Sequence, residues 1–445
     1  MGTIKTPGVE VQAIVAPTSV QQQKRQLIRN AGAAATLGFF GPWSVNRVWA
    51  QAKTKKPLLV GLSTDDTGQY GESGRDEQLG IVMAINEVNA RGGVLGRHIE
   101  TVHGDTGGDA VKAAAVAEDM LAKKEVSFLL GGVHSGAANA ISKVAQKYGC
   151  IYFNTNSSSP SEAGKDCHRT KFVWDGNGTN FSTAVVRGAM TGFGRDWLLV
   201  TSDYEWGRNT ARGIRNIVEA NGGKIVDEIL VPQNTRDFAG VLQKIQRAKA
   251  GVVATALGGD DLKLFRDQVR QAKLETSYGW INNQQDWPDV YGLGREAMFG
   301  IFLTTWYWGM NLPGVKDFVL RYQRAHPNYR IKVPGNVFYN GYMATHELFN
   351  AIERVGSTNN LKIIRELEGL KVPAIKRMQH EDAYMNPLTH HFQQNIYIAA
   401  YNTYPKQPDD LYRILGRLKP DEVEDKDSVR TCKLESYAAT PSYEP

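Results

Sequence analysis

The sequence predicts an α/β protein with two lobes, each built on a parallel sheet flanked by helices. Short apolar segments, typical of buried strands, alternate with amphipathic helical segments along most of the chain. The alternation runs twice, first from Leu58 to Trp174 and again from Asn180 to Ile281. Strands that are separated by single helices pair in parallel, so two such series predict two similar lobes.

The first strand–loop–helix unit is the clearest. The apolar run Leu58–Leu62 is short enough for a buried strand, and Ser73-Gly-Arg-Asp76 has the form of a capping box, which predicts a helix start at Ser73. Gly92 and Gly93 end this helix. The loop Ser63–Gly71 therefore lies at the carboxyl end of a strand, where open α/β sheets bind ligands.

The later elements follow the same alternation. We expect strands at His98–Gly104, Val126–Gly131, Cys150–Phe153, Lys171–Trp174, Trp197–Thr201, Lys224–Val231, Val252–Leu257, Tyr278–Ile281 and Gly300–Thr305. We expect helices at Asp109–Lys123, Ser135–Tyr148, Asn180–Thr191, Gly207–Ala220, Asp237–Ala248, Asp261–Lys273, Pro313–Ala325, Gly335–Val355 and Leu361–Leu370. His391–Asn402 is predicted to be one strand without a preceding crossover helix, and residues 406–445 an irregular tail.

The amino terminus has the pattern of a secretory signal peptide. A basic segment, Lys24–Arg29, precedes the weakly apolar segment Ala31–Trp43, and Ala50-Gln-Ala52 offers a cleavage site. We therefore expect residues 1–52 to be removed near Ala52 and the mature chain to reside in the periplasm. Lys24-Arg25 resembles a twin-arginine export signal with lysine in the first position, which leaves the export route open.

Composition excludes several classes of protein. The chain has 445 residues, enough for two domains, and a net charge of +6; residues 1–52 carry +4 of this, which leaves +2 on the mature chain. The remaining charges are mixed in sign, so we expect no nucleic-acid partner. The nine histidines are dispersed and no cysteine pair has metal-ligand spacing, so no metal and no cofactor are expected.

The three cysteines lie in different settings. Cys150 opens an apolar strand and is expected to be a buried thiol, whereas Cys167 and Cys432 lie in polar segments. In an oxidising compartment Cys167 and Cys432 are predicted to pair, with a Cys150–Cys167 pair as the alternative.

Two motifs resemble the opening of the Leu/Ile/Val-binding family of type I periplasmic substrate-binding proteins. These are Gly61-Leu-Ser-Thr-Asp-Asp-Thr-Gly-Gln-Tyr-Gly71 and Ala84-Ile-Asn-Glu-Val-Asn-Ala-Arg-Gly-Gly-Val-Leu-Gly96, and the similarity extends to about Asn402. The resemblance implies a type I periplasmic-binding-protein fold with three hinge crossings, near Gly176, Leu303 and Val372. The first lobe would then comprise residues 57–176 plus 303–372, and the second 177–302 plus 373–405.

The same resemblance implies a function and its partners. Such proteins capture a small molecule in the cleft between the lobes and deliver it to the membrane subunits of an ABC importer, without catalysis. We expect this chain to do so as a monomer, with an amino acid, an amide or a related small organic molecule as ligand.

Polar loops after predicted strands provide the candidate ligand contacts. Ser135 would present a hydroxyl and a free amide at a helix start, and the family's ligand-binding positions fall on Asn156 and Ser158. Trp206 matches the family's aromatic residue on the second lobe and faces Tyr70, so we expect the two rings to hold the ligand between them. The secondary candidates are Asp66, Gln69, His134, Gly258, Asp286 and Trp306.

The sequence departs from the amino-acid-binding members in the second lobe. Asn283 stands where the resemblance leads us to expect a carboxylate for the ligand's ammonium group, and Asp286 is displaced from that position. A buried ammonium without a counter-charge is costly, so we expect a neutral polar or amide-like ligand held by Asn283 and its neighbours. The rival is that Asp286, Asp260 or Asp66 reaches the ligand.

Two other functions are compatible with parts of the pattern. A ligand-sensing partner of a membrane receptor would use the same fold and cleft. A Rossmann-type oxidoreductase is suggested only by Gly68, Gly71 and Gly74, whose spacing is wrong for the dinucleotide-binding fingerprint.

Overall fold

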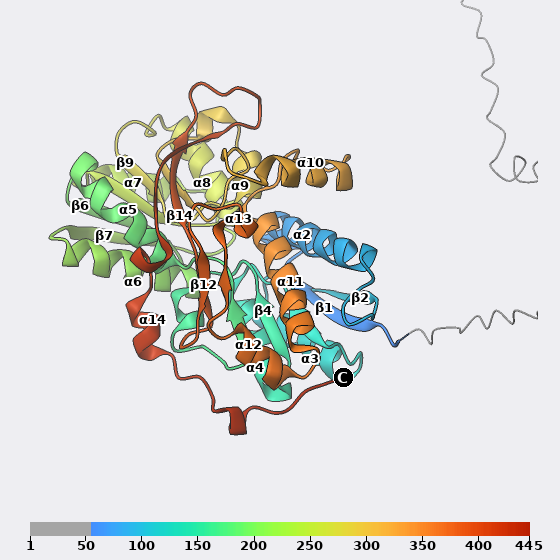
Figure 1. Cartoon of the computed structure of the whole chain (residues 1–445). Coiled ribbons are helices and arrows are strands. Elements are labelled where there is room, and N and C mark those ends of the chain that lie inside the picture. Colours follow the sequence, from blue (N-terminus) through green and yellow to red (C-terminus); the bar gives the residue numbers. More distant parts are fainter. Residues whose placement is uncertain (1–54) are drawn as a thin grey trace, which may run out of the picture. The chain divides into compact units, whose positions relative to one another are not determined.

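The computed structural model describes residues 55–445, which form two lobes, each with a sheet covered by helices (Figure 1). The signal peptide predicted at residues 1–52 lies outside the described residues. Within residues 55–445, no helix is long and apolar enough to cross a membrane.

The first lobe is built on an eight-stranded sheet with the order β11-β12-β13-β5-β4-β3-β1-β2. Its strands are β1 (Leu58–Thr64), β2 (Ile99–Asp105), β3 (Phe128–Leu130), β4 (Ile151–Asn154), β5 (Lys171–Val173), β11 (Lys371–Val372), β12 (Ala383–Asn386) and β13 (His391–Gln393). Its main helices are α2 (Gly71–Ala90), α3 (Ala110–Ala122), α4 (Ser135–Tyr148), α11 (Asn336–Val355) and α12 (Asn360–Leu367).

The second lobe is built on a seven-stranded sheet with the order β15-β14-β10-β9-β8-β6-β7. Its strands are β6 (Asp196–Ser202), β7 (Lys224–Val231), β8 (Val252–Ala256), β9 (Gly279–Asn282), β10 (Ile301–Thr304), β14 (Ile396–Tyr401) and β15 (Tyr412–Leu418). Its main helices are α5 (Gly178–Phe193), α6 (Glu205–Ala220), α7 (Ala239–Arg247) and α8 (Gly259–Gln271). The shorter or connecting helices of the two lobes are α9 (Trp287–Tyr291), α10 (Val315–Ala325), α13 (Ala374–Arg377) and α14 (Lys426–Thr431).

The predicted two-lobed α/β class is confirmed, but both sheets are mixed rather than wholly parallel. The strands of the two βα series pair in parallel, as their single crossover helices require. The late strands add antiparallel pairs, β11–β12–β13 in the first sheet and β10–β14–β15 in the second.

The third crossing between the lobes lies later in the chain than the sequence predicts. The segment expected to be one strand, His391–Asn402, is two strands in different sheets: β13 pairs with β5, and β14 pairs with β10. The chain therefore crosses at Gln394–Asn395, and the crossing expected near Val372 is wrong. A continuous run with strand character does not show which strands its two halves pair with. In the structure, Gln394 lies at this crossing and donates from Nε2 to the Trp174 carbonyl, 2.8 Å away, beside the first crossing.

The segment 406–445 is also more ordered than predicted. It contains β15, which extends the second sheet, and α14, which lies against the first lobe at Pro160. A disulfide joins Cys432 to Cys167, with 5.6 Å between the Cα atoms, while Cys150 is a buried free thiol. The predicted pairing is confirmed, and the chain ends beside α12 and α3 (Figure 1).

Helix α2 begins at Gly71 rather than at Ser73. The predicted capping box does not form, because Tyr70 occupies the N-cap position and Ser73 and Asp76 are fully buried. Gly74 requires the absence of a side chain, since a Cβ atom would lie 2.1 Å from the carbonyl oxygen of Asp65. This close approach sets the start of α2 against the loop after β1 and so positions Tyr70.

Candidate functional site

A small cavity lies between the lobes, at the carboxyl ends of the central parallel strands of both sheets. Its eleven lining residues are Tyr70, Val133, Asn156, Ser158, Tyr204, Trp206, Leu257, Gly258, Gln284, Asp286 and Asp289. The space open to the centres of water molecules is about 20 Å³, little more than one water needs. A ligand therefore enters only when the lobes part or these side chains move.

Aromatic rings from both lobes form one wall. Tyr70 comes from the first lobe, while Tyr204 and Trp206 come from the start of α6 in the second lobe, Tyr204 as its N-cap. The hydroxyl groups of Tyr70 and Tyr204 are 2.5 Å apart, and the Tyr204 and Trp206 ring centroids are 6.1 Å apart. The buried indole N–H of Trp206 has no hydrogen-bond partner among residues 55–445, so this wall retains one free donor.

The two lobes are in direct contact around the cavity. Gln69 donates from Nε2 to the Gly258 carbonyl at 3.0 Å, and Ser158 donates to the Gln284 side chain. His134 stacks on Tyr204, with ring centroids 4.7 Å apart. These contacts must break when the lobes separate.

Two buried carboxyl groups form the opposite part of the lining. Asp286 accepts from Asn336 Nδ2 at 3.1 Å, and Asp289 accepts from the Gly259 amide at 2.9 Å. Burial raises the pKa of each to about 7; Asp175 adds to the effect on Asp286, and Asp286 adds to that on Asp289. They are the only acidic or basic side chains among the eleven lining residues.

Asp286 is therefore not displaced from the ligand cavity, and the expectation that the second lobe offers no anion is wrong. Asn283, predicted to stand in for that anion, instead donates to the Gly178 carbonyl at 3.1 Å and accepts from Ser182 at 2.8 Å. Asp289 escaped the sequence analysis, although its spacing of three residues from Asp286 in a helical turn was a usable signal.

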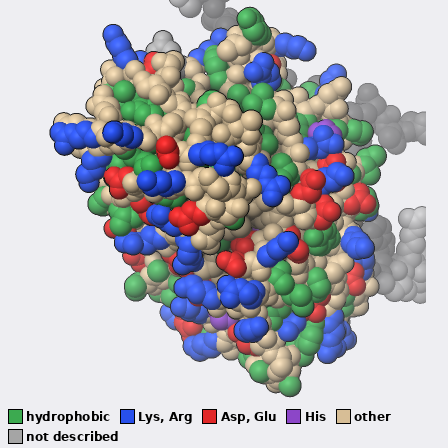
Figure 2. All heavy atoms as spheres, turned by 90° about the vertical axis from the view of Figure 1, so that its left-hand side faces the viewer, with side chains coloured by type: hydrophobic (Ala, Val, Ile, Leu, Met, Phe, Trp, Pro, Cys, Tyr) green, Lys and Arg blue, Asp and Glu red, His purple; other side chains and the backbone are tan. Residues whose placement is uncertain are grey.

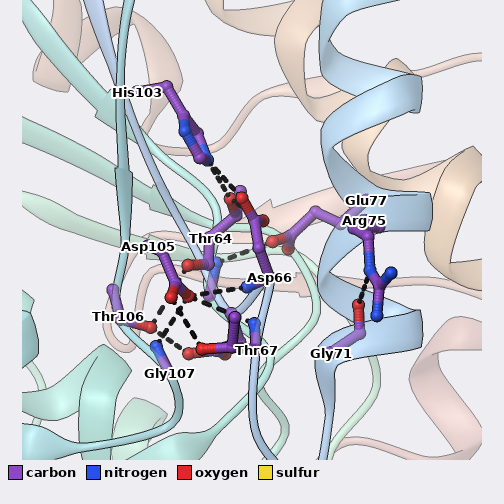
Figure 3. Close-up of polar contacts among 12 residues, drawn as sticks. Thr64, Asp66, Thr67, Gly71, Arg75, Glu77, His103, Asp105, Thr106 and Gly107 are labelled. Atoms are coloured by element: carbon purple, nitrogen blue, oxygen red, sulfur yellow. Dashed lines mark hydrogen bonds and ion pairs between the residues drawn. The ribbon is translucent and has the colours of Figure 1, made fainter.

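Five other predicted residues lie outside the cavity lining: Gln69 and His134, which make the contacts between the lobes described above, and Ser135, Trp306 and Asp66. Ser135 accepts a hydrogen bond from Ser157, 3.0 Å away. Trp306 packs face to face on Tyr339, with centroids 4.7 Å apart, in the hydrophobic core. Asp66 contacts His103, with 2.6 Å between its carboxylate oxygen and the ring Nε2 (Figure 3).

Several donors of the first lobe near the cavity are occupied by acids of the chain itself. Asp65 accepts from the amides of Val133 and His134, at 2.8 and 2.7 Å, at the start of α4. Glu77 accepts from the Gly132 amide at 3.0 Å and from Asn156 Nδ2 at 2.9 Å. Burial raises the pKa of Glu77 to about 7, although these hydrogen bonds act in the opposite direction and lower it.

Glu162 accepts from three further donors of the same lobe. It accepts from the Ser157 hydroxyl, from the Asn154 side chain and from the Ser159 amide, the last at 3.2 Å. Sequence reasoning missed Glu77, although a charged side chain on the apolar face of α2, one turn before Ile81, was a visible signal.

Asp105 holds the loop that carries Gln69 and Tyr70. Its carboxylate accepts from the amides of Asp66 and Gly107, both at 2.9 Å, and from Lys112 Nζ at 2.9 Å (Figure 3). These donors, with the Thr67 hydroxyl, hold the pKa of Asp105 well below its usual range. The hydrogen bonds and the ion pair of Asp105 thus hold the loop that carries Tyr70, which forms the first-lobe wall of the cavity.

A larger surface groove lies elsewhere, between α5, α6 and the carboxyl-terminal segment. It encloses about 900 Å³ and is lined by both signs of charge, for example Arg187, Arg212, Glu422 and Asp425. On the face shown in Figure 2, basic and acidic side chains are likewise interspersed. The groove shares no lining residue with the interlobe cavity. No group of three or more His, Cys, Asp or Glu side chains in residues 55–445 has the arrangement of a metal site.

The fold and the cavity together define a two-lobed solute-binding protein. The sequence profile described as "Periplasmic binding protein" matches residues 57–406, and the chain belongs to this family. The Leu/Ile/Val-binding protein homolog 8 of Brucella abortus (strain 2308) is 22% identical over 321 residues, covering 69% of this chain and 79% of that protein.

Solved structures support the same fold. A periplasmic binding protein from Burkholderia mallei has a TM-score of 0.77 at 21% identity, covering 84% of this chain and 98% of its own. A solute-binding protein of an ABC transporter from Rhodopseudomonas palustris BisB5, solved with 3,4-dihydroxybenzoic acid, has a TM-score of 0.71 at 20% identity, covering 82% and 98%. The fold is therefore that of the type I periplasmic binding proteins.

Proposed function

We propose that this protein is the solute-binding component of an ABC importer. It captures a small organic molecule in the interlobe cavity and delivers it to the membrane subunits, without chemical change. The observation that carries this proposal is the cavity itself, which lies at the strand ends of both sheets and is closed by hydrogen bonds between the lobes. A ligand that bridges the two walls favours the closed form, which the membrane subunits then recognise.

Each wall has a distinct role in this proposal. Tyr70, Tyr204 and Trp206 supply apolar contact area with few rotatable bonds, as aromatic anchors do. Gln284, Asp286 and Asp289 orient the polar part of the ligand. The ligand's entry requires the Gln69–Gly258 and Ser158–Gln284 contacts to open.

Solute uptake in a deletion strain tests the proposal. A strain without the gene should lose uptake of the solute that the purified mature chain binds, and the wild-type gene should restore it. Trp206→Ala should not restore it, because the aromatic wall is lost, whereas Tyr404→Ala should, because Tyr404 is 87% exposed and outside the cavity. Normal uptake in the deletion strain, with loss of a transcriptional response to the same solute, would instead indicate a sensor.

A further inference from the structure

The first lobe has few free donors for an anionic ligand. A ligand carboxylate would require amide or hydroxyl donors, and a helix start is the usual place for them. Here Asp65 occupies the amides of Val133 and His134 at the start of α4. Glu77 occupies the Gly132 amide and the Asn156 side chain, so the chain's own acids already engage four first-lobe donors beside the cavity.

The second lobe turns carboxyl groups toward the same cavity. Asp286 and Asp289 are 8% and 3% exposed, and no Lys, Arg or His is among the eleven lining residues. The charge of Lys263 acts on Asp289, but Lys263 is itself paired with Asp260 at 2.7 Å and with Glu72 at 3.1 Å. An anionic ligand would therefore add a further negative charge beside the two acids. A cation would instead be attracted to both carboxylates and would offset the repulsion between them.

The aromatic wall is compatible with a cation as well. The faces of tyrosine and tryptophan rings attract cations, and the Tyr70 and Tyr204 hydroxyl oxygens can accept hydrogen bonds from an ammonium group. Burial of both hydroxyls keeps them protonated at neutral pH, because it raises the pKa of Tyr70 and of Tyr204 far above the usual value.

We propose that the ligand of this cavity is a small protonated amine that carries no carboxylate. This inference rests on the proposed function, because it concerns the ligand of the same cavity. Asp286 and Asp289 hold the ammonium group, and Tyr70, Tyr204 and Trp206 cover the rest of the molecule. Asp65 and Glu77 act as specificity residues, since they accept from amides and a side chain that would otherwise be free to donate to the carboxylate of an amino acid or an aromatic acid.

Matched ligand pairs test the inference by changing only the carboxylate. We would titrate the mature chain by calorimetry at pH 7.5 with 3-methylbutylamine against leucine and with 2-phenylethylamine against phenylalanine. The buffer is phosphate, because Tris is itself an amine. We expect at least one amine to bind ten-fold or more tightly than its amino acid. Absence of binding by both amines, or equal or tighter binding of the amino acid, overturns the inference.

Substitutions in the cavity supply a second test. Asp286→Asn should weaken binding of the amine ten-fold or more, while Asp260→Asn, a carboxylate of α8 that does not line the cavity, should leave it unchanged. Equal effects of the two substitutions contradict the inference. If Asp286→Asn does not fold, the wild-type chain still decides, because affinity for the amine should rise from pH 6 to pH 8 as the two carboxyl groups lose protons. An affinity that is constant or falls over this range overturns the proposal.

The two proposals fail in different ways. If leucine, 4-hydroxybenzoic acid or a neutral amide binds instead of an amine, the amine inference is wrong and the solute-binding function stands. If an amine binds but the deletion strain takes it up normally, the inference about the cavity stands and the transport function is wrong.

Discussion

Replacing Asp286 by asparagine should make the free energy of unfolding less dependent on pH between pH 6 and pH 8. Asp286 is buried beside Asp289, and burial raises its pKa from the ordinary 3.8 to about 7. At pH 6 the folded protein therefore retains a proton on this carboxyl group, whereas the unfolded chain has already released it. The folded state loses this advantage as the pH rises from about 4 to about 8.

The size of the effect follows from the shift. For a single carboxyl group with these two pKa values, linkage predicts a loss of about 1.4 kcal/mol in the free energy of unfolding between pH 6 and pH 8. Asparagine does not titrate, so this loss should disappear. The neighbouring carboxyl of Asp289 should also titrate at lower pH, because the repulsion from Asp286 is gone, and this adds to the flattening.

Urea unfolding of the mature chain at pH 6, 7 and 8 in phosphate buffer, without added ligand, measures the difference. Asp260→Asn is the matched control, since Asp260 is partly exposed and paired with Lys263, and it should keep the wild-type pH dependence. The reasoning is refuted if Asp286→Asn loses as much stability between pH 6 and pH 8 as the wild type does.

Three further predictions concern the disulfide, a close helix contact and the closure of the two lobes. The Cys167→Ser/Cys432→Ser variant should lose about 2–4 kcal/mol of unfolding free energy in urea, and a reducing agent should no longer lower its stability; equal stability of variant and wild type would contradict this. Gly80→Ala should lower the thermal midpoint, because its Cβ atom would lie 2.2 Å from the Phe338 carbonyl oxygen, whereas Gly188→Ala, in open space on α5, should leave it unchanged or raise it. A saturating ligand should reduce or preserve the radius of gyration and protect the cavity loops from hydrogen exchange; faster exchange of those loops would argue against closure by the ligand.

The sequence alone determined the two-lobed α/β class and the edge of each sheet that carries the site. Hydrophobic periodicity and glycine positions encode which segments are strands and helices, because they depend only on neighbours along the chain. The family resemblance pointed to Asn156, Ser158 and Trp206, and Tyr70 was expected opposite Trp206; the structure brings all four into the cavity lining. The polar settings of two cysteines were enough to predict their disulfide.

Only the tertiary structure decided how late segments pair and which polar groups remain free. The run that ends at Tyr401 has strand character throughout, yet its two halves belong to different sheets, because strand pairing depends on partners far away in the sequence. The free donors and acids of the cavity could not be read from the sequence for the same reason. Whether a donor is available depends on its competitors in space, and Glu77, 79 residues away in the chain, already accepts from Asn156. Burial, which the packing of the two lobes creates, raises the pKa of Asp286 and Asp289 to about 7, a property that the sequence alone does not show.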